Sequence, residues 1–289
     1  MRVALFVPCY VDQLKPRVGL ASLELLRHAG IEPDFPIDQT CCGQPFLTAG
    51  ELARARDLGR HFLAVFADFD AIVTPSGSCA ATLRRQLAHI APGPEAERVG
   101  AHTFELCEFL TRHTRLPAPT SPFPHRVGLH ASCHALRELG LGTPSETRGA
   151  TELDPAAQLL AGVPGLELID LARRDECCGF GGIFSVEEDA VSARMGLDRL
   201  NDHRRGRAEV LTSTDVSCLL HLEGLARKRE WPLRVLHVAE ILAESLGLLA
   251  SEGEERAEPS DGRAREPRQS SGSEHNVRRS AGSEVHGTR

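Results

Sequence analysis

The sequence of 289 residues is poor in lysine and contains no long apolar run. Its only lysines are Lys15 and Lys228, so arginine carries almost all of the positive charge, and the formal net charge is −7. Because phosphate binding needs a basic surface, this balance argues against a nucleic-acid partner. No stretch approaches the roughly 20 apolar residues of a membrane-spanning helix, and the apolar run within residues 1–8 is too short for a signal peptide. We therefore expect a cytoplasmic protein with no membrane span.

Large apolar residues are missing from the last part of the chain. Residues 251–289 contain no Ile, Leu, Phe, Tyr or Trp, and Ser, Gly, Glu, Arg and Pro dominate the segment. Such a segment cannot bury enough apolar surface to offset the entropy lost on ordering, so we expect a disordered tail. The whole chain is 41% hydrophobic and 25% charged, an ordinary globular balance that allows a sizeable core in residues 1–250.

The nine cysteines form no Cys-x-x-Cys pair, which excludes the usual zinc knuckle and the ferredoxin-type run. In a reducing compartment a disulfide framework is not expected. The cysteines are better interpreted as metal ligands, redox groups or small buried side chains.

Eight of the cysteines recur in the same order in two similar halves. Each half begins with a short apolar strand that leads to a cysteine, at Arg2–Cys9 and at Arg126–Cys133. Each continues with a Cys-Cys-Gly element, and then with a second apolar strand that leads to a lone cysteine. The resulting sets are Cys9, Cys41, Cys42 and Cys79 in the first half, and Cys133, Cys177, Cys178 and Cys218 in the second.

Strands alternate with helical patterns in both halves, which predicts an α/β fold with parallel sheets. We expect two small, pseudo-symmetric α/β domains at residues 1–118 and 125–250, joined by the proline-rich run 117–124, with the tail 251–289 after them. Apolar residues at helical spacing predict helices within Leu20–Leu26 and Leu52–Phe66. Each half is expected to close with a helix, near His102–His113 and His237–Leu248, and the second half to carry insertions around Leu141–Leu153.

The lone cysteines and Cys9 and Cys133 all follow strands directly. Because the carboxyl ends of parallel strands share one edge of the sheet, the four cysteines of each half should converge there, beside helix N-termini that favour thiolates. The glycine after each cysteine pair permits close backbone approach or a positive φ. Four thiolates per half is the usual count for a [4Fe–4S] or [2Fe–2S] cluster, and we expect one cluster, a [4Fe–4S], in each domain. Zinc ligation and eight buried free thiols are the alternatives.

The ninth cysteine, Cys107, differs from the other eight. Its counterpart in the second half is Ala239, so Cys107 is interpreted as a small core residue.

Each half resembles the CCG cysteine-rich domain, whose pattern is a cysteine, a Cys-Cys-Gly and a final Cys-x-x-Cys. That domain occurs in the cysteine-rich B component of heterodisulfide reductase, in the iron–sulfur component of glycolate oxidase and in the C component of anaerobic glycerol-3-phosphate dehydrogenase. Five stretches, at residues 7–12, 38–45, 75–79, 177–182 and 214–218, are similar to the lactate utilization protein A family. The resemblance covers about residues 1–245.

The resemblance implies an iron–sulfur electron-transfer subunit in the oxidation of L-lactate to pyruvate. The implied partners are a larger protein with ferredoxin-type iron–sulfur clusters and a third, small lactate utilization subunit. Whether the chain is an enzyme without them is left open. One departure is clear, because Ser76 and Asp215 stand where the final Cys-x-x-Cys has its first cysteine. Each half thus has four cysteines instead of five, and Ser76 and Asp215 are interpreted as helix caps, with an oxygen ligand as the alternative.

Two other functions remain open: a thiol–disulfide oxidoreductase of the heterodisulfide reductase type, and a zinc-stabilised scaffold for partner proteins. His130 and His134 flank Cys133 and are interpreted as partly exposed polar residues, with cluster tuning as the alternative. The glycines of 179–182 lack the spacing of a dinucleotide fingerprint and are assigned to loop flexibility. Further candidates near the sites are Asp12, Gln44, Arg137 and Arg173.

Overall fold

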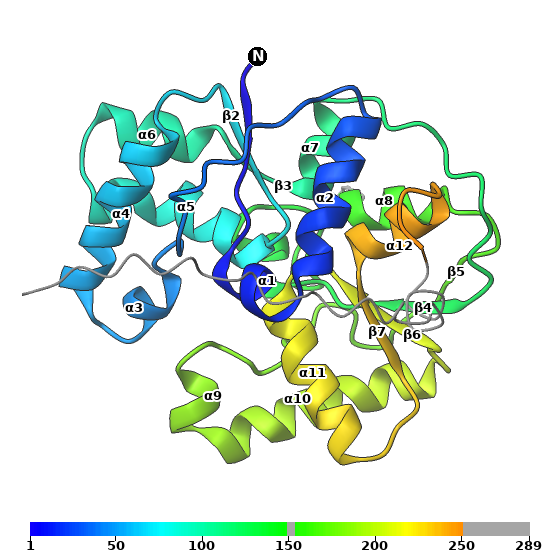
Figure 1. Cartoon of the computed structure of the whole chain (residues 1–289). Helices are drawn as coiled ribbons and strands as arrows, with labels where there is room; N and C mark the ends of the chain where they lie inside the picture. The colour runs from blue at the N-terminus through cyan, green and yellow to red at the C-terminus, as the bar shows by residue number, and fades with distance from the viewer. Residues whose placement is uncertain (149–153, 251–289) are drawn as a thin grey trace, which may run out of the picture. The chain divides into compact units, whose positions relative to one another are not determined.

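Two parallel β-sheets with helices packed around them make up the described part of the chain, which covers residues 1–148 and 154–250 of this computed structural model (Figure 1). The first sheet has the order β1-β2-β3, and the second has the order β5-β4-β6-β7. Their bounds are β1 (Val3–Leu5), β2 (Ala71–Thr74), β3 (Thr103–Glu105), β4 (Arg126–Leu129), β5 (Glu167–Leu168), β6 (Val210–Ser213) and β7 (Arg234–His237). The predicted α/β class is confirmed, and the tail expected at 251–289 lies outside the described residues.

The two sheets repeat one strand order. β1, β2 and β3 of the first half correspond to β4, β6 and β7 of the second, and every pairing is parallel. Where β5 pairs with β4, the first half has a single parallel bridge between Asp34 and Ala4 beside β1. The strands β1, β2 and β6 consist of buried Val, Ile, Leu, Ala, Thr and Ser residues, as expected for strands covered on both faces.

Helices connect the strands in both halves. The helical patterns predicted within Leu20–Leu26 and Leu52–Phe66 lie in α2 and α4, which confirms them. In the first half the helices are α1 (Cys9–Leu14), α2 (Pro16–His28), α3 (Gln44–Thr48), α4 (Leu52–Phe66), α5 (Gly77–Ile90), α6 (Pro94–Ala101) and α7 (Leu106–Arg112). In the second half they are a π-helical turn (His134–Glu138), α8 (Pro155–Ala161), α9 (Phe184–Glu187), α10 (Asp189–Arg205), α11 (Val216–Lys228) and α12 (Val238–Ser245).

The closing segments differ from the prediction. The helix expected at His102–His113 begins only at Leu106, because Thr103–Glu105 forms β3 and pairs with β2. The buried Glu105 side chain then accepts N–H bonds from Cys107 and Glu108, which turns the chain from strand to helix. The second closing helix covers Val238–Ser245, after β7. Part of the expected insertion, residues 149–153, lies outside the described residues.

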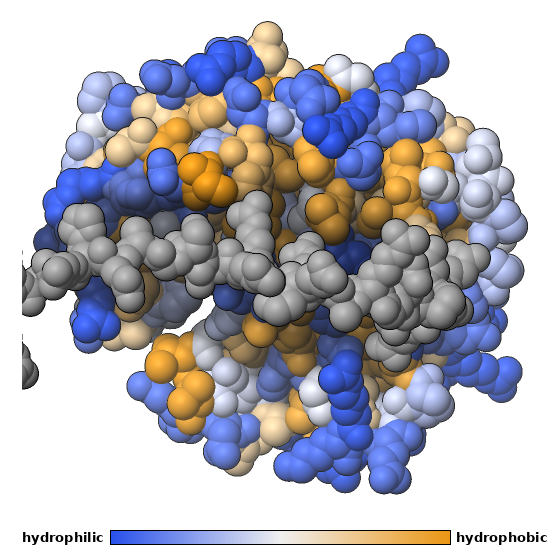
Figure 2. Space-filling view, viewed as in Figure 1, coloured by the Kyte–Doolittle hydropathy of each residue, from blue (hydrophilic) through white to orange (hydrophobic). Residues whose placement is uncertain are grey.

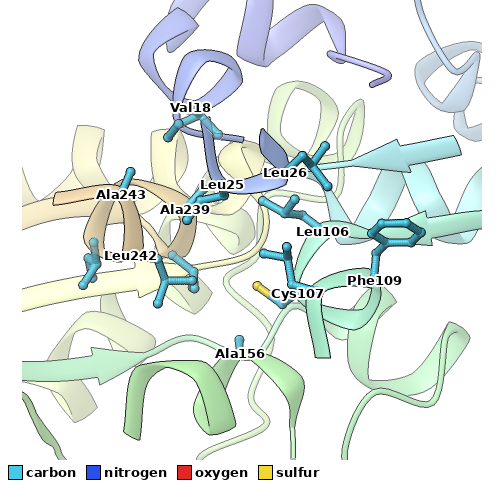
Figure 3. Close-up of a cluster of buried hydrophobic side chains, with 14 of the residues drawn as sticks. Val18, Leu25, Leu26, Leu106, Cys107, Phe109, Ala156, Ala239, Leu242 and Ala243 are labelled. Atoms are coloured by element: carbon cyan, nitrogen blue, oxygen red, sulfur yellow. The ribbon is translucent and has the colours of Figure 1, made fainter. Parts of the chain in front are cut away.

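The two halves share a hydrophobic core that lies under α2, α7, α8 and α12. Val18 and Leu25 of the first half and Leu242 and Ala243 of the second belong to one buried cluster. Figure 3 shows these side chains together with Cys107, whose thiol is drawn among carbon atoms. Cys107 and Ala239 are both fully buried there, which confirms the interpretation of Cys107 as a core residue.

Each sheet is covered on its other face by the helices of its own half. In the first half α4, α5 and α6 close a cluster around Phe6, Phe62 and Phe66, and in the second half α10 and α11 close one around Leu211 and Leu222. Figure 2 shows hydrophilic residues around the margin of the face drawn there, with apolar side chains gathered nearer its middle. Among residues 1–148 and 154–250, no helix has both the length and the apolar character that a membrane crossing requires.

Candidate metal centre

The first cysteine set gathers at the carboxyl ends of β1 and β2. Cys9 begins α1 after the first strand, and Cys79 lies in the first turn of α5 after the second. The loop before α3 supplies Cys41 and Cys42. The sulfur atoms of Cys9 and Cys41 are 3.8 Å apart, and those of Cys42 and Cys79 are 3.2 Å apart. The parallel register thus brings together four thiols that are spread between residues 9 and 79 of the sequence.

The second set repeats this arrangement at the ends of β4 and β6. Cys133 precedes the π-helical turn, and Cys218 lies in the first turn of α11. The Cys178 and Cys218 sulfur atoms lie within 4.8 Å of each other, and Cys177 lies close enough to Cys133 and Cys178 to interact with both thiols. As predicted from the repeat, the structure brings each group of four thiols together. Their assignment as metal ligands stays a prediction.

The glycine of each Cys-Cys-Gly element adopts the left-handed conformation. Both Gly43 and Gly179 have φ of +86°, which a residue with a side chain rarely adopts. This turn directs backbone N–H groups at the sulfur atoms: Gly43 donates to Cys41 at 3.4 Å and Gly179 to Cys177 at 3.3 Å. Such donors stabilise a thiolate, and a thiolate is the form of cysteine that binds metal.

In each set one thiol has a lowered pKa and lies beside others whose pKa is raised. Hydrogen bonds from Cys42 and Cys9 lower the pKa of Cys41 to about 3, and bonds from Cys133 and Cys178 lower the pKa of Cys177 to about 2. The bond to Cys41, together with burial, raises the pKa of Cys9 far above its usual range. A metal that binds these thiols would displace their protons, because the thiolate is the form that ligates metal.

The two sets face each other across the boundary between the halves, and Asp215 joins them. Its carboxylate accepts the backbone N–H of Ser78 in α5 at 2.7 Å and that of Ser217 in α11 at 3.2 Å. The Gly77 N–H also donates to the Thr214 carbonyl at 3.1 Å. Asp215 lines both the small cavity against the first set and the cavity of about 90 Å³ against the second.

Ser76 and Asp215 are N-caps, as the sequence predicted. The Ser76 hydroxyl accepts the Cys79 N–H at 3.2 Å, and Asp215 caps α11 through Ser217. The sequence did not reveal that Asp215 also bonds the other half. Nothing in the sequence alone indicates this contact, because it depends on how the two halves pack against each other.

The two histidines beside Cys133 have different environments. His134 is partly buried, with Nδ1 at 3.6 Å from the Cys133 sulfur and Nε2 at 3.1 Å from the Gln44 side chain of the first half. For His130 the prediction of partial exposure was wrong, because it is 1% exposed. His130 continues β4 and faces inward, and one of its nitrogens lies within 4.8 Å of the Cys178 and Cys218 sulfurs.

The remaining candidates are two arginines near the second set, Arg137 and Arg173, and Asp12 in α1 of the first half. Arg137 and Arg173 line a cavity of about 810 Å³ that also contains Cys133 and Cys177. Both arginines are already ion-paired, Arg137 with Glu146 and Asp175, and Arg173 with Glu176. Asp12 is exposed and its carboxylate accepts a hydrogen bond from its neighbour Gln13.

Comparison with known proteins agrees with this geometry. The family model of the CCG cysteine-rich domain matches residues 3–84 and 127–223, one stretch in each half. Lactate utilization protein A of Geobacillus thermodenitrificans is 39% identical over 247 residues, which are 84% of this chain and 98% of that protein. The protein of the same name from Exiguobacterium sp. is also 39% identical, over 251 residues, with the same coverage.

The chain belongs to the lactate utilization protein A family. The resemblance found in the sequence is thereby confirmed, and both CCG stretches contain a complete four-cysteine set. A crystal structure of a hypothetical protein from Helicobacter pylori is similar in fold, with a TM-score of 0.52 at 12% identity over 85% of this chain and 49% of that one. Eight soft sulfur donors in two converging groups give this family member the means to hold metal.

Proposed function

We propose that this chain is an iron–sulfur electron-transfer subunit of a system that oxidises L-lactate to pyruvate. The observation that carries the proposal is the convergence of two four-thiol sets on facing sheet edges, joined through the Asp215 carboxylate. The named role of its relatives in lactate utilization supplies the substrate. We delimit the two cluster-bearing domains at residues 1–118 and 125–250, and we place the protein in the cytoplasm, where thiols stay reduced.

The donor chemistry fits one cluster in each set, which we take to be a [4Fe–4S]. Cys9, Cys41, Cys42 and Cys79 would hold the first, and Cys133, Cys177, Cys178 and Cys218 the second. Such a cluster takes up and gives back one electron at a time. Lactate oxidation releases two electrons and two protons, so two one-electron centres in one chain match the electron count of the reaction.

This chain's own residues supply ligands, position and shielding. The Gly43 and Gly179 N–H groups point at sulfur and favour the charged ligand form. Tyr10 of the first half packs edge-on against Phe180 of the second, with ring centroids 5.9 Å apart, and both rings line the cavity beside the second set. These rings cover part of the space beside the second set with apolar surface, and the apolar surroundings of a metal site tune its potential. The chain would act with a ferredoxin-type iron–sulfur protein and a third, small subunit.

The proposal is tested by adding L-lactate to the anaerobically purified chain in the presence of the two partner proteins. Visible absorbance from the clusters should bleach with L-lactate and stay unchanged when either partner is omitted. Cys41→Ser and Cys177→Ser should each reduce the amplitude by about half. Bleaching by dithionite but never by lactate and partners would contradict the assignment. Reoxidation by a disulfide substrate would favour the thiol–disulfide alternative instead.

A further inference from the structure

The two cysteine sets differ in what lies behind them. In the first half Phe6 follows β1, and its backbone N–H bonds to the Val73 carbonyl at 2.8 Å. Its ring makes edge contacts with Phe62 and Phe66 of α4, with centroids 5.2 and 5.6 Å apart. The first set is therefore backed by a fully apolar wall.

In the second half a buried polar group occupies the same place. His130 follows β4, and its N–H bonds to the Thr212 carbonyl at 2.7 Å, the same register as Phe6. Arg199 and His203 lie four residues apart on α10, the second helix after the second Cys-Cys-Gly, as Phe62 and Phe66 do on α4, the second helix after the first. All three residues are buried, and Arg199 and His203 are both 0% exposed.

These side chains are under-satisfied within the described residues. Both ring nitrogens of His130 lack a hydrogen-bond partner there, as do Nε and Nη2 of Arg199. The third guanidinium nitrogen, Nη1, bonds to the Arg173 carbonyl and, at 3.2 Å, to Asp202. A buried charge with open donors is costly unless it has a role. The first half shows that the same fold accepts phenylalanines at these positions, so folding does not require the polar group.

His130 lies beside the second cysteine set, and Arg199 lies near His130. His130 has a nitrogen within 4.8 Å of the Cys178 and Cys218 sulfurs. Arg199 lies close enough to His130 to lower the pKa of that imidazole, after the larger effect of burial. The guanidinium is charged at every accessible pH. Its partner Asp202 also accepts the N–H groups of Ala172 and Arg173, so that carboxylate is shared among several donors.

We propose that His130 and Arg199 form a hydrogen-bonding wall with a buried cation, ion-paired with Asp202, that raises the reduction potential of the second centre and makes it the electron acceptor of the pair. The proposal rests on the proposed function, since it assumes a cluster in each set. A reduced centre carries one more negative charge, and a fixed cation in a low-dielectric interior stabilises that charge. Hydrogen bonds to ligand sulfur act in the same direction. Asp215 lines the cavities against both sets, but its carboxylate acts on Cys133 and Cys218 of the second set and opposes this effect. The variants below leave Asp215 in place, so they measure the contribution of the arginine and histidine alone.

The test is a redox titration of the iron-loaded full chain, followed by electron paramagnetic resonance. Cys41→Ser leaves only the second set complete, so its midpoint can be measured alone in that background. Adding Arg199→Met should lower the reduced-to-oxidised ratio at a fixed solution potential at least tenfold, or about 59 mV for one electron. His130→Phe should shift the midpoint in the same direction, and Arg199→Lys, which keeps the charge, should restore most of the wild-type value.

The matched control uses Cys177→Ser, in which only the first set is complete. Phe62→Leu in that background should leave the midpoint unchanged, because no charge is altered. If the Arg199→Met variant does not fold, Arg199→Gln removes the same positive charge and serves in its place. An unchanged or raised midpoint in the arginine and histidine variants would overturn the proposal, and so would loss of iron in His130→Phe, since that would make His130 a ligand. A wild-type chain that binds no iron would instead overturn the proposed function.

Discussion

Single residues decide how closely the backbone can approach each cysteine pair. Gly43 and Gly179 have the same φ of +86°, yet their surroundings differ. A Cβ at Gly43 would meet nothing nearer than 3.7 Å, whereas at Gly179 it would lie 2.6 Å from the Ser192 carbonyl oxygen and 2.7 Å from the Met195 Cβ. The first position needs only the conformational freedom of glycine, and the second also needs its small size.

This difference predicts unequal costs for one substitution. Gly43→Ala should lower the free energy of unfolding by about 1–2 kcal/mol, the cost of a left-handed residue with a side chain. Gly179→Ala should cost a further 1–3 kcal/mol or so, because α10 must move away. Urea unfolding of the two metal-free, reduced variants measures both values. Equal losses would show that the packing of α10 against this loop is not as described.

A second feature at the scale of single residues is the buried group of His130, Arg199 and His203 in the second half. The sequence placed His130 beside Cys133, but the prediction of partial exposure was wrong. Burial of His130 depends on Arg199 and His203. These residues come from α10, a helix far along the chain from His130. A comparison of α4 with α10 contains the signal, because Phe62 and Phe66 stand where Arg199 and His203 do. Periodicity alone marks such positions as buried without saying what surrounds them.

At the scale of helices, the two cysteine-bearing helices α5 and α11 meet at their N-termini. Each N-terminus has unpaired N–H groups and a partial positive charge. Asp215 lies between them and accepts from both, so one carboxylate caps a helix in each half. Asp215 therefore ties the two cysteine-bearing helix ends together, beside the backbone bond from Gly77 to Thr214.

Removing this carboxylate should destabilise the chain more than removing an ordinary cap. Asp215→Ala should lower the free energy of unfolding by about 2–4 kcal/mol, because two caps of about 1–2 kcal/mol each are lost. Asp154 is the matched control, because its carboxylate caps α8 alone, through the Ala156 N–H at 2.8 Å. Asp154→Ala should cost about 1 kcal/mol. Chemical denaturation of the reduced, metal-free variants compares them, and equal costs would argue that Asp215 does not join the halves.

Most of the elements could be predicted from the sequence, and the exceptions have a common cause. The strands that carry the cysteines follow from short apolar runs, and α2 and α4 follow from helical spacing. The segment 103–105 was expected to be helical because apolar content continues into α7. It forms a strand since β2 offers an open edge to pair with, and pairing between residues 31 positions apart is invisible to local patterns.

At the scale of the whole described chain, the halves share a core and present their cysteine sets to each other. The repeat in the sequence predicted two similar units with four convergent thiols each, since parallel strands end at one edge. The sequence did not indicate that α2, α7, α8 and α12 would bury their apolar faces in one cluster. A hydrophobic face shows in a sequence, whereas the partner that covers it does not. That shared core is what brings Asp215 and Gln44 across the boundary.

The central claim is that each cysteine set holds its own cluster, and iron and acid-labile sulfide content tests it most directly. Anaerobically purified wild-type protein should contain about eight iron atoms per chain, as two [4Fe–4S] clusters require. Cys41→Ser and Cys177→Ser should each retain about half, and Cys107→Ala, which copies Ala239 in the core, should retain all of it. A colourless protein with stoichiometric zinc, or iron content that is unchanged in both serine variants, would contradict the account.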